Sequence, residues 1–554
     1  MEPKIVPNRR RPAPLIAAGL AACLLLGACE TQPLQQLQQL KEKLPFQAGD
    51  ARPVVLDAPL PPAPERKWAD AAEDVNNYRG GGWGLVNMPA MRVYLNGLYG
   101  RLKAMGGHPD WPGEVYVLAD PSLKSTSSAA GNVYLSLAWL QSIESEDEIF
   151  ALLAHEYGHV YLGHHVIYEA TDAGDMASRL GMVAVSLANR AAQATTPNGV
   201  VAISVIRDVA ASTLVPGWKR SVEEEADTFG VTLSLRAGYS YARGFKTFLE
   251  RIATYDDGSR ELAAKALTET ERREREAAVK GVVERARQQQ GNKPDPSGLN
   301  AGFVDLQVKL QESMSDAGAS MSRTMAGLAG RLRETHADAA SREDSLSKQV
   351  AGALAGRPRV AARTAPWEAA RKEPATAEIL AHYAMLAQVD DALARRAYPE
   401  ALKLATASAS GRTATDALPL YTLAVATLQA NPRAVTTDLA RRHLAAPERS
   451  WKFELMAIDG ETRRNRVNGR AMLEQQFAYF QKAPALWPDV IAYYRDNGYL
   501  PEAKAMAQTC IWKLGNYRDA CIVSSTTEAE RKEQQAATDR KAKELVDKYG
   551  PKMK

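Results

Sequence analysis

The sequence predicts an α+β domain followed by an all-helical domain. Two short runs with strand character, 115–118 and 132–136, lie between longer segments that have the 3.6-residue periodicity of amphipathic helices. From about residue 366 to residue 523 the patterns are helical throughout. A chain of 554 residues is also too long for one ordinary hydrophobic core, so at least two domains are expected.

The charge balance is nearly even, with 69 Lys and Arg residues against 65 Asp and Glu residues and a formal net charge of +4. Such a balance lacks the excess of basic residues that binding to nucleic acid requires, so no nucleic-acid partner is expected. Hydrophobic residues make up 45% and charged residues 24% of the chain, as in soluble globular proteins. After the N-terminus the sequence contains no apolar run with the length of a membrane span.

The first 28 residues have the order of a secretion signal. Three arginines at 9–11 precede an apolar run, 15–26, that is too short to span a membrane. Leu-Gly-Ala then precedes Cys29, which resembles the bacterial lipobox, in which the cysteine is lipidated after cleavage. By the rules of lipoproteins, Glu30 favours the outer membrane. We therefore expect a periplasmic, lipid-anchored protein, and the alternative is an ordinary signal peptide in which Cys29 carries no lipid.

Changes in composition predict five segments. Residues 1–28 are the lipoprotein signal peptide, and 29–66, rich in Gln, Leu and Pro, form a tether that holds the next domain off the membrane. The α+β domain is expected over 67–347 and the helical domain over 366–523. The remaining stretch, 524–554, is a charged C-terminal tail.

The chemistry is carried by an H-E-x-x-H motif at 155–159, inside an apolar stretch that predicts a buried helix. Helical spacing places His155 and His159 on one face, where both imidazoles can bind a single metal ion. Zinc accepts neutral imidazole nitrogen, and a catalytic zinc site needs three protein ligands and an open position for water. Glu156 is next to the first ligand and can activate that water as a general base. The alternative is a chance match with two hydrogen-bonded histidines.

The same helix has a predicted start and a predicted end. Ser145 and Glu148 form a capping-box pattern just upstream of the motif. His164 and His165 follow the second ligand. We expect them at the C-terminus of the helix, where positive charge is favourable, rather than at the metal.

A third metal ligand must come from another part of the chain. Arg220, Glu223, Ala226 and Asp227 form an Arg-x-x-Glu-x-x-Ala-Asp pattern downstream of H-E-x-x-H. The combination resembles the gluzincin peptidase family of the CAAX prenyl protease, HtpX and the OMA protease, and within it the periplasmic branch of the beta-barrel assembly-enhancing type. This resemblance implies a zincin-like fold, one Zn²⁺ per chain, Glu223 as the third ligand and zinc metalloendopeptidase activity.

Helix geometry separates the carboxylates of this second motif. Successive residues of a helix are rotated by about 100°, so Glu223 and Asp227 lie about 40° apart on one face. Glu224 and Glu225 turn away from that face and are expected not to affect the metal. Asp227 is expected to accept a hydrogen bond from the distal N–H of one of the two histidine ligands.

Two further segments fit the resemblance. The run 131–136 lies where the family has the edge strand that pairs with the substrate backbone, although an ordinary core strand is an equal alternative. His336 resembles a family histidine that is followed by proline, but Ala337 takes the place of that proline. Two interpretations of His336 stay open: a histidine on a surface loop, which carries slightly more weight, and an oxyanion or regulatory group near the zinc.

The helical domain contains units such as the Tyr-Pro-Glu-Ala run at 398–401, which resemble tetratricopeptide-type (TPR-like) helical hairpins. The resemblance implies that these repeats bind substrates or the outer-membrane protein assembly machinery. Cys510 and Cys521 are expected either to form a disulfide in an oxidising compartment or to remain as two buried thiols.

The sequence therefore predicts a zinc-dependent endopeptidase that acts on protein or peptide substrates in the quality control of misfolded or misassembled envelope proteins. The alternative is a non-catalytic or latent envelope chaperone or scaffold that retains the zincin shell.

Overall fold

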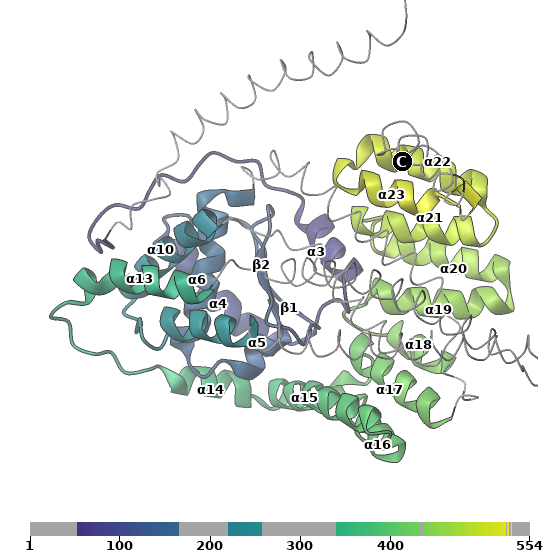
Figure 1. Cartoon of the computed structure of the whole chain (residues 1–554), viewed down its shortest axis with the longest axis horizontal. Coiled ribbons are helices and arrows are strands. Elements are labelled where there is room, and N and C mark those ends of the chain that lie inside the picture. Colours follow the sequence, from purple (N-terminus) through teal and green to yellow (C-terminus); the bar gives the residue numbers. More distant parts are fainter. Residues whose placement is uncertain are drawn as a thin grey trace, which may run out of the picture. The chain divides into compact units, whose positions relative to one another are not determined.

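The computed structural model describes residues 53–165, 220–256, 339–431 and 436–527, together with residues 434, 529, 530 and 533. The described chain is mostly helical and contains one small sheet, as predicted (Figure 1). The first region contains α3 (Ala71–Gly80), α4 (Pro89–Met105), β1 (Val115–Leu118), β2 (Ser125–Ser127), β3 (Val133–Ser136), α5 (Leu137–Ser142), α6 (Glu146–Leu162), α10 (Arg220–Arg236) and α13 (Ala339–Leu354).

The sheet has three strands in the described part of the chain, in the order β1-β3-β2. Strand β3 pairs in parallel with β1, with Val133 opposite Val115, and antiparallel with β2, with Val133 opposite Ser127. The expectation that residues 131–136 form the edge strand is therefore wrong, and the alternative of a core strand holds. The reason is β2, a short Ser-Thr-Ser strand without the apolar alternation that marks a strand in a sequence.

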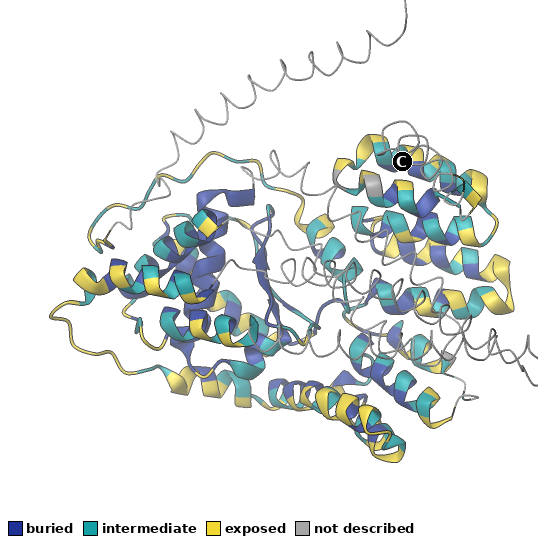
Figure 2. Ribbon diagram, viewed as in Figure 1, coloured by how far each residue is buried: buried dark blue, intermediate teal, exposed yellow. Residues whose placement is uncertain are grey.

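Helix α6, which carries the H-E-x-x-H motif, lies at the centre of the hydrophobic core and is buried along all 17 of its residues (Figure 2). Its predicted start is confirmed, because the side chain of Ser145 accepts a hydrogen bond of 3.3 Å from the Glu148 N–H. The helix ends at Gly163, whose φ of 70° lies in the left-handed region that favours glycine.

Two glycines allow α6 and α10 to approach each other closely. A Cβ atom on Gly158, inside the motif, would lie 3.0 Å from backbone atoms of Ala226 on α10. A Cβ atom on Gly230 of α10 would lie 2.9 Å from the backbone of Ala154 on α6. A side chain at either position would push the two helices apart, so these glycines set the distance at which α10 presents Glu223 to the motif.

The described part of the expected tether packs against the domain rather than extending away from it. Val54 is buried, and its N–H donates to the Gln349 carbonyl at 2.9 Å. The Arg236 guanidinium donates to the Leu56 carbonyl at 2.8 Å. The packed chain therefore includes residues 53–66, because this Pro-rich stretch also carries apolar side chains that the core can bury.

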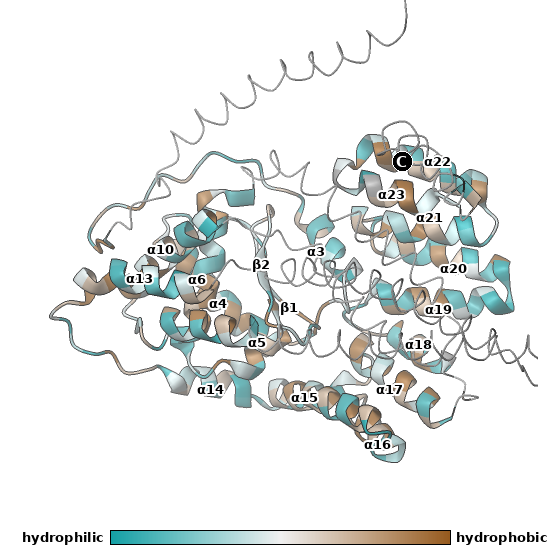
Figure 3. Ribbon diagram, in the orientation of Figure 1, coloured by the Kyte–Doolittle hydropathy of each residue, from teal (hydrophilic) through white to brown (hydrophobic). Residues whose placement is uncertain are grey.

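The second region consists of helices only, in the part that the structure describes. They are α14 (Thr364–Lys372), α15 (Pro374–Ala394), α16 (Tyr398–Ser408), η1 (Gly411–Thr413), α17 (Ala417–Ala430), α18 (Thr437–His443), α19 (Trp451–Arg464), α20 (Arg466–Tyr479), η2 (Pro484–Leu486), α21 (Trp487–Asp496), α22 (Leu500–Lys513), η3 (Gly515–Tyr517) and α23 (Arg518–Ser525). Successive long helices pack on one another, as α15 and α16, α19 and α20, and α21 and α22 do. The apolar and polar residues that alternate along these ribbons in Figure 3 are those of amphipathic helices.

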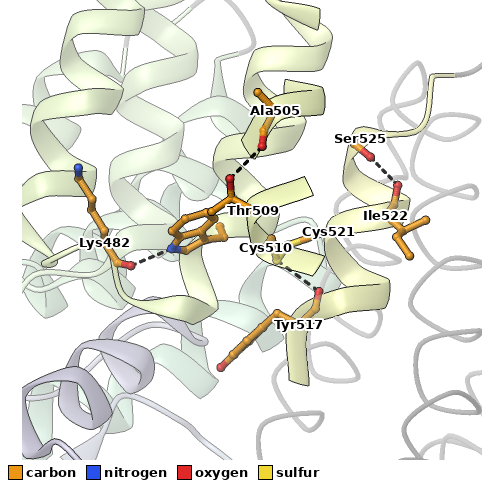
Figure 4. Close-up of a disulfide and its surroundings, with 9 residues drawn as sticks. Lys482, Ala505, Thr509, Cys510, Tyr517, Cys521, Ile522 and Ser525 are labelled. Atoms are coloured by element: carbon orange, nitrogen blue, oxygen red, sulfur yellow. Dashed lines mark hydrogen bonds between the residues drawn. A yellow bond between two sulfur atoms is a disulfide. The ribbon is translucent and has the colours of Figure 1, made fainter. Parts of the chain in front are cut away.

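At the end of this region a disulfide joins Cys510 of α22 to Cys521 of α23 (Figure 4). Both cysteines are fully buried. The bond links two helices that already pack on each other, across a sequence separation of 11 residues. Within the described residues we find no helix that combines the length and the apolar content of a membrane span.

Candidate metal centre

Three side chains from α6 and α10 converge in the buried interior. The Nε2 atoms of His155 and His159 lie 3.2 Å apart, and each lies 3.5 Å from one carboxylate oxygen of Glu223. All three residues have no exposed surface. Among the described residues, this is the one group of His, Cys, Asp and Glu side chains whose ligand atoms lie close enough together to hold a metal ion.

The spacing of these atoms fits a zinc ion. Zinc binds imidazole nitrogen and carboxylate oxygen at roughly 2.0–2.2 Å, and a tetrahedral arrangement at these distances separates two ligand atoms by roughly 3.3–3.6 Å. The separations of 3.2 and 3.5 Å agree with that geometry. The donor set of two imidazoles and one carboxylate is also that of catalytic zinc sites in which a fourth position is open for water.

The ring of His155 is held from behind by a carboxylate. Its Nδ1 atom lies 2.9 Å from Asp227 Oδ1. Arg342 of α13 in turn donates two hydrogen bonds to Asp227, from Nε to Oδ2 at 2.8 Å and from Nη2 to Oδ1 at 2.7 Å. Burial opposes the ionisation of Asp227, but Arg342 and His155 hold the pKa of its carboxyl below the usual range.

Arg342 also contacts the carboxylate that would bind metal, since its Nη1 atom lies 2.7 Å from Glu223 Oε2. Burial lowers the pKa of Arg342, but the charges of Asp227 and Glu223 outweigh burial and raise it. One guanidinium therefore compensates two buried carboxylates. The sequence analysis missed this residue, although a signal exists, because Arg342 shares the buried stripe of α13 with Leu346 and Val350.

The ring of His159 has a different neighbour. Its Nδ1 atom lies 2.9 Å from Nδ1 of His164, and the Nε2 atom of His164 lies 3.4 Å from Glu225 Oε2. His164 does follow the end of α6, as expected, but it is 1% exposed and faces the site. Glu225 lies outside the group of ligand atoms, as expected, but it contacts His164, because the left-handed turn at Gly163 brings His164 back within reach of α10.

Glu224, the second of the three consecutive glutamates at 223–225, points away from the metal centre, as expected. Glu224 forms an ion pair with Arg220 one turn earlier in α10, at 2.8 Å, and both side chains are partly exposed. His165, next to His164, lies 3.0 Å from the Ser127 hydroxyl of β2 through its Nε2 atom. Burial lowers the pKa of His165 to about 3, so its ring is neutral at physiological pH and ties the end of α6 to the sheet.

Glu156 follows His155 in α6 and is also fully buried. The pKa of Tyr78 in α3 is raised mainly by burial and by Asp74, and Glu156 makes a smaller contribution in the same direction. A carboxylate in this position is excluded from bulk solvent and adjacent in sequence to a metal-ligand candidate. This position next to a ligand candidate makes Glu156 the candidate for proton transfer in a metal-assisted hydrolysis.

The structure thus brings His155, Glu156, His159, Glu223 and Asp227 into one buried region. Cys29 and His336, the other two candidates from the sequence, lie outside the described residues. The disulfide pair lies in the helical region, where it takes no part in the metal centre.

A buried His-His-Glu centre with a glutamate after the first histidine defines a metallopeptidase-like site. Residues 125–350 match the family model of peptidase family M48. This range begins with β2 and includes α6, α10 and Arg342, so the whole centre lies within the match. This part of the chain is therefore similar to the M48 peptidases.

Curated relatives agree with this assignment at low identity. The chain is 26% identical over 173 residues to a protein of Vibrio cholerae serotype O1, 25% over 169 residues to a protein of Yersinia pestis, and 23% over 168 residues to a protein of Escherichia coli K12. The last two are named beta-barrel assembly-enhancing protease, and the chain is homologous to them. Each match covers 30% of this chain and 34% of the relative, so it spans about a third of the relatives' length.

Proposed function

We propose that this chain is a zinc-dependent endopeptidase of the bacterial cell envelope. The observation that carries the proposal is the convergence of His155, His159 and Glu223, whose ligand atoms lie 3.2 and 3.5 Å apart in a buried site. A carboxylate for proton transfer, Glu156, comes from the same helix as the two histidines. The M48 match supports a peptidase as the class of enzyme.

In this proposal His155, His159 and Glu223 hold one zinc ion per chain. When bound, zinc would polarise a peptide carbonyl and lower the pKa of a water molecule toward about 7. Glu156 takes the proton of the attacking water and delivers it to the leaving amine. Asp227 and Arg342 keep the His155 ring and the Glu223 carboxylate in place, so that the site does not have to reorganise during the reaction.

The cell envelope is proposed as the location on two observations. The N-terminal segment resembles a lipoprotein signal that is followed by Cys29, which implies a lipid anchor. By the lipobox rules this anchor is in the outer membrane. The disulfide between Cys510 and Cys521 supports an oxidising compartment, because disulfides persist in the periplasm and are rare in the cytosol.

The proposed role is quality control of misfolded or misassembled envelope proteins. It rests on the names of the relatives, which describe proteases that enhance beta-barrel assembly. The helical region, which we propose to be TPR-like, would capture protein substrates or the outer-membrane protein assembly machinery. His336 would act near the zinc as an oxyanion or regulatory group.

The proposal is tested with the purified chain and its Glu156→Gln variant, in a peptidase assay on an unfolded, dye-labelled protein, with zinc content measured in parallel. Glutamine keeps the shape of the side chain and removes the base, so activity should fall by roughly 10²-fold or more while zinc is retained. Undiminished activity with zinc still bound would refute the proposed mechanism. A wild-type chain that binds zinc but cleaves nothing would instead support the alternative of a latent or non-catalytic scaffold.

A further inference from the structure

We propose that His164 and Glu225 form a positioning relay for the second zinc ligand, equivalent to the one that Asp227 and Arg342 form for the first. The inference deepens the proposed function and rests on it, because it requires that His159 binds zinc. His164 and Glu225 are therefore positioning residues, which act on the metal through His159.

The two histidine ligands present the same ring atoms to the centre. Each directs Nε2 toward the other and toward Glu223, which leaves Nδ1 of each ring on the outer side. The outer atom of His155 faces Asp227 at 2.9 Å, and the outer atom of His159 faces His164 at 2.9 Å. Each ligand therefore has a hydrogen-bond partner at its outer Nδ1 atom. The partner of His155 is a carboxylate, whereas the partner of His159 is another imidazole.

Zinc binding determines which atom donates along this relay. A neutral imidazole that binds zinc through Nε2 carries its hydrogen on Nδ1, so His159 Nδ1–H donates to Nδ1 of His164. His164 must then carry its own hydrogen on Nε2. That atom lies 3.4 Å from Glu225 Oε2, so the carboxylate favours the tautomer of His164 that can accept from His159.

The local fold accounts for the meeting of these three groups. His164 comes five residues after His159, and it can reach back only because the chain reverses at Gly163 in the left-handed conformation. A Cβ at Gly163 would also lie 2.8 Å from Pro64 of the packed N-terminal segment. Glu225 comes from α10, two residues after Glu223 and two before Asp227, so one helix supplies a zinc ligand, the partner of His155 and the partner of His164.

His164 and Glu225 are largely buried, unlike surface side chains that contact each other without a structural role. His164 is 1% exposed, and the side chain of Glu225 is 14% exposed. Glu224, between the two functional glutamates, has a side chain that is 31% exposed and pairs with Arg220 at the surface. The helix thus offers a matched control one residue away from the relay.

The test measures zinc affinity of the full chain by competition with a chelator, without any activity assay. His164→Leu removes the acceptor and should weaken zinc binding by about 10- to 100-fold. His164→Asn keeps an acceptor oxygen near the position of Nδ1 and should recover part of that loss. Glu225→Gln should weaken binding by less than His164→Leu, and Glu224→Gln should leave it unchanged.

Glu223→Gln separates failure of the relay from failure of the proposed function. Zinc binding by Glu223→Gln as tight as in the wild type would refute the metal site itself. If Glu223→Gln loses zinc but His164→Leu binds it as tightly as the wild type, the relay alone is refuted. The relay is also refuted if His164→Asn is no better than His164→Leu, because the loss would then come from packing. Circular dichroism of the zinc-free variants checks that each one is folded.

Discussion

Helices α6 and α22 both pack against neighbouring helices, but they differ in how much of each helix is buried and in which residue types are buried. All 17 residues of α6 are buried, including the two histidines and the glutamate of its motif. Of the 14 residues of α22, the buried ones are Ala503, Ala507 and Cys510, and Trp512 in its last turn is 87% exposed.

The difference shows what kind of function a sequence can reveal. A polar residue on a helix that is buried all round needs a specific partner, so its presence in an apolar stretch already indicates chemistry. The buried positions of an amphipathic helix indicate packing only, and its exposed face carries no comparable signal. The catalytic chemistry could therefore be predicted from residues, whereas the partner of the helical region could be inferred from resemblance alone.

The largest expected effect comes from removing a ligand in the buried region. Glu223→Ala deletes one of three zinc ligands, so zinc should be lost from the purified protein and peptidase activity should be abolished. Metal analysis of this variant next to Glu224→Ala checks the prediction, because Glu224 lies at the surface of the same helix. Loss of zinc from Glu224→Ala but not from Glu223→Ala would mean that the third ligand has to be reassigned.

Arg342 is expected to have the largest effect on stability. Arg342→Leu removes the one guanidinium that compensates the two buried carboxylates of Glu223 and Asp227, so the zinc-free protein should lose about 3–5 kcal/mol of unfolding free energy. Urea unfolding measures this, and Lys348→Ala is the control on the same helix. Lys348 forms an exposed ion pair with Asp344 and should contribute at most about 0.5 kcal/mol. Similar losses in both variants would contradict the proposed role of Arg342.

The helical region buries a carboxylate whose titration should be visible. Burial raises the pKa of Glu454 in α19 from 4.5 to about 7, and Arg449 only partly opposes the shift. Because the folded-state value is the higher one, the stabilising contribution is complete below about pH 4.5 and is lost as the pH rises through 7. The loss should reach about 3 kcal/mol in the local opening free energy of α19, measured by hydrogen exchange.

A variant pair isolates this contribution of Glu454. Glu454→Gln should remove most of the pH dependence of α19 between pH 4.5 and 7. Glu474→Gln, on the neighbouring helix α20, replaces a half-exposed glutamate and should leave that dependence intact. Equal profiles for the wild type and Glu454→Gln would show that Glu454 does not titrate in this range.

The disulfide is expected to have the smallest effect of the four. Its loop is short and its two helices already pack on each other, so the paired substitution Cys510→Ser and Cys521→Ser should cost about 2–3 kcal/mol, confined to α22 and α23. Mass spectrometry of protein from the periplasm should find the two cysteines linked before reduction. Free thiols at both positions in that material would argue against the proposed compartment.

The sequence was sufficient for the parts of the fold and site that depend on local pattern. The start of α6 follows from the Ser145 cap, and the meeting of His155 with His159 follows from helical spacing. The three-stranded order could not be predicted, because β2 has no apolar alternation. Arg342 and His164 act through contacts with residues distant in the chain or across a turn, and periodicity alone does not specify such contacts.

The most direct test of the central claim is zinc K-edge X-ray absorption on the purified full chain. The account predicts one zinc per chain with two imidazole nitrogens and at least one carboxylate oxygen at about 2.0–2.2 Å, and a loss of bound zinc in Glu223→Gln. A zinc ion bound by sulfur, or a spectrum that is unchanged by Glu223→Gln, would contradict the assignment of His155, His159 and Glu223 as the metal centre.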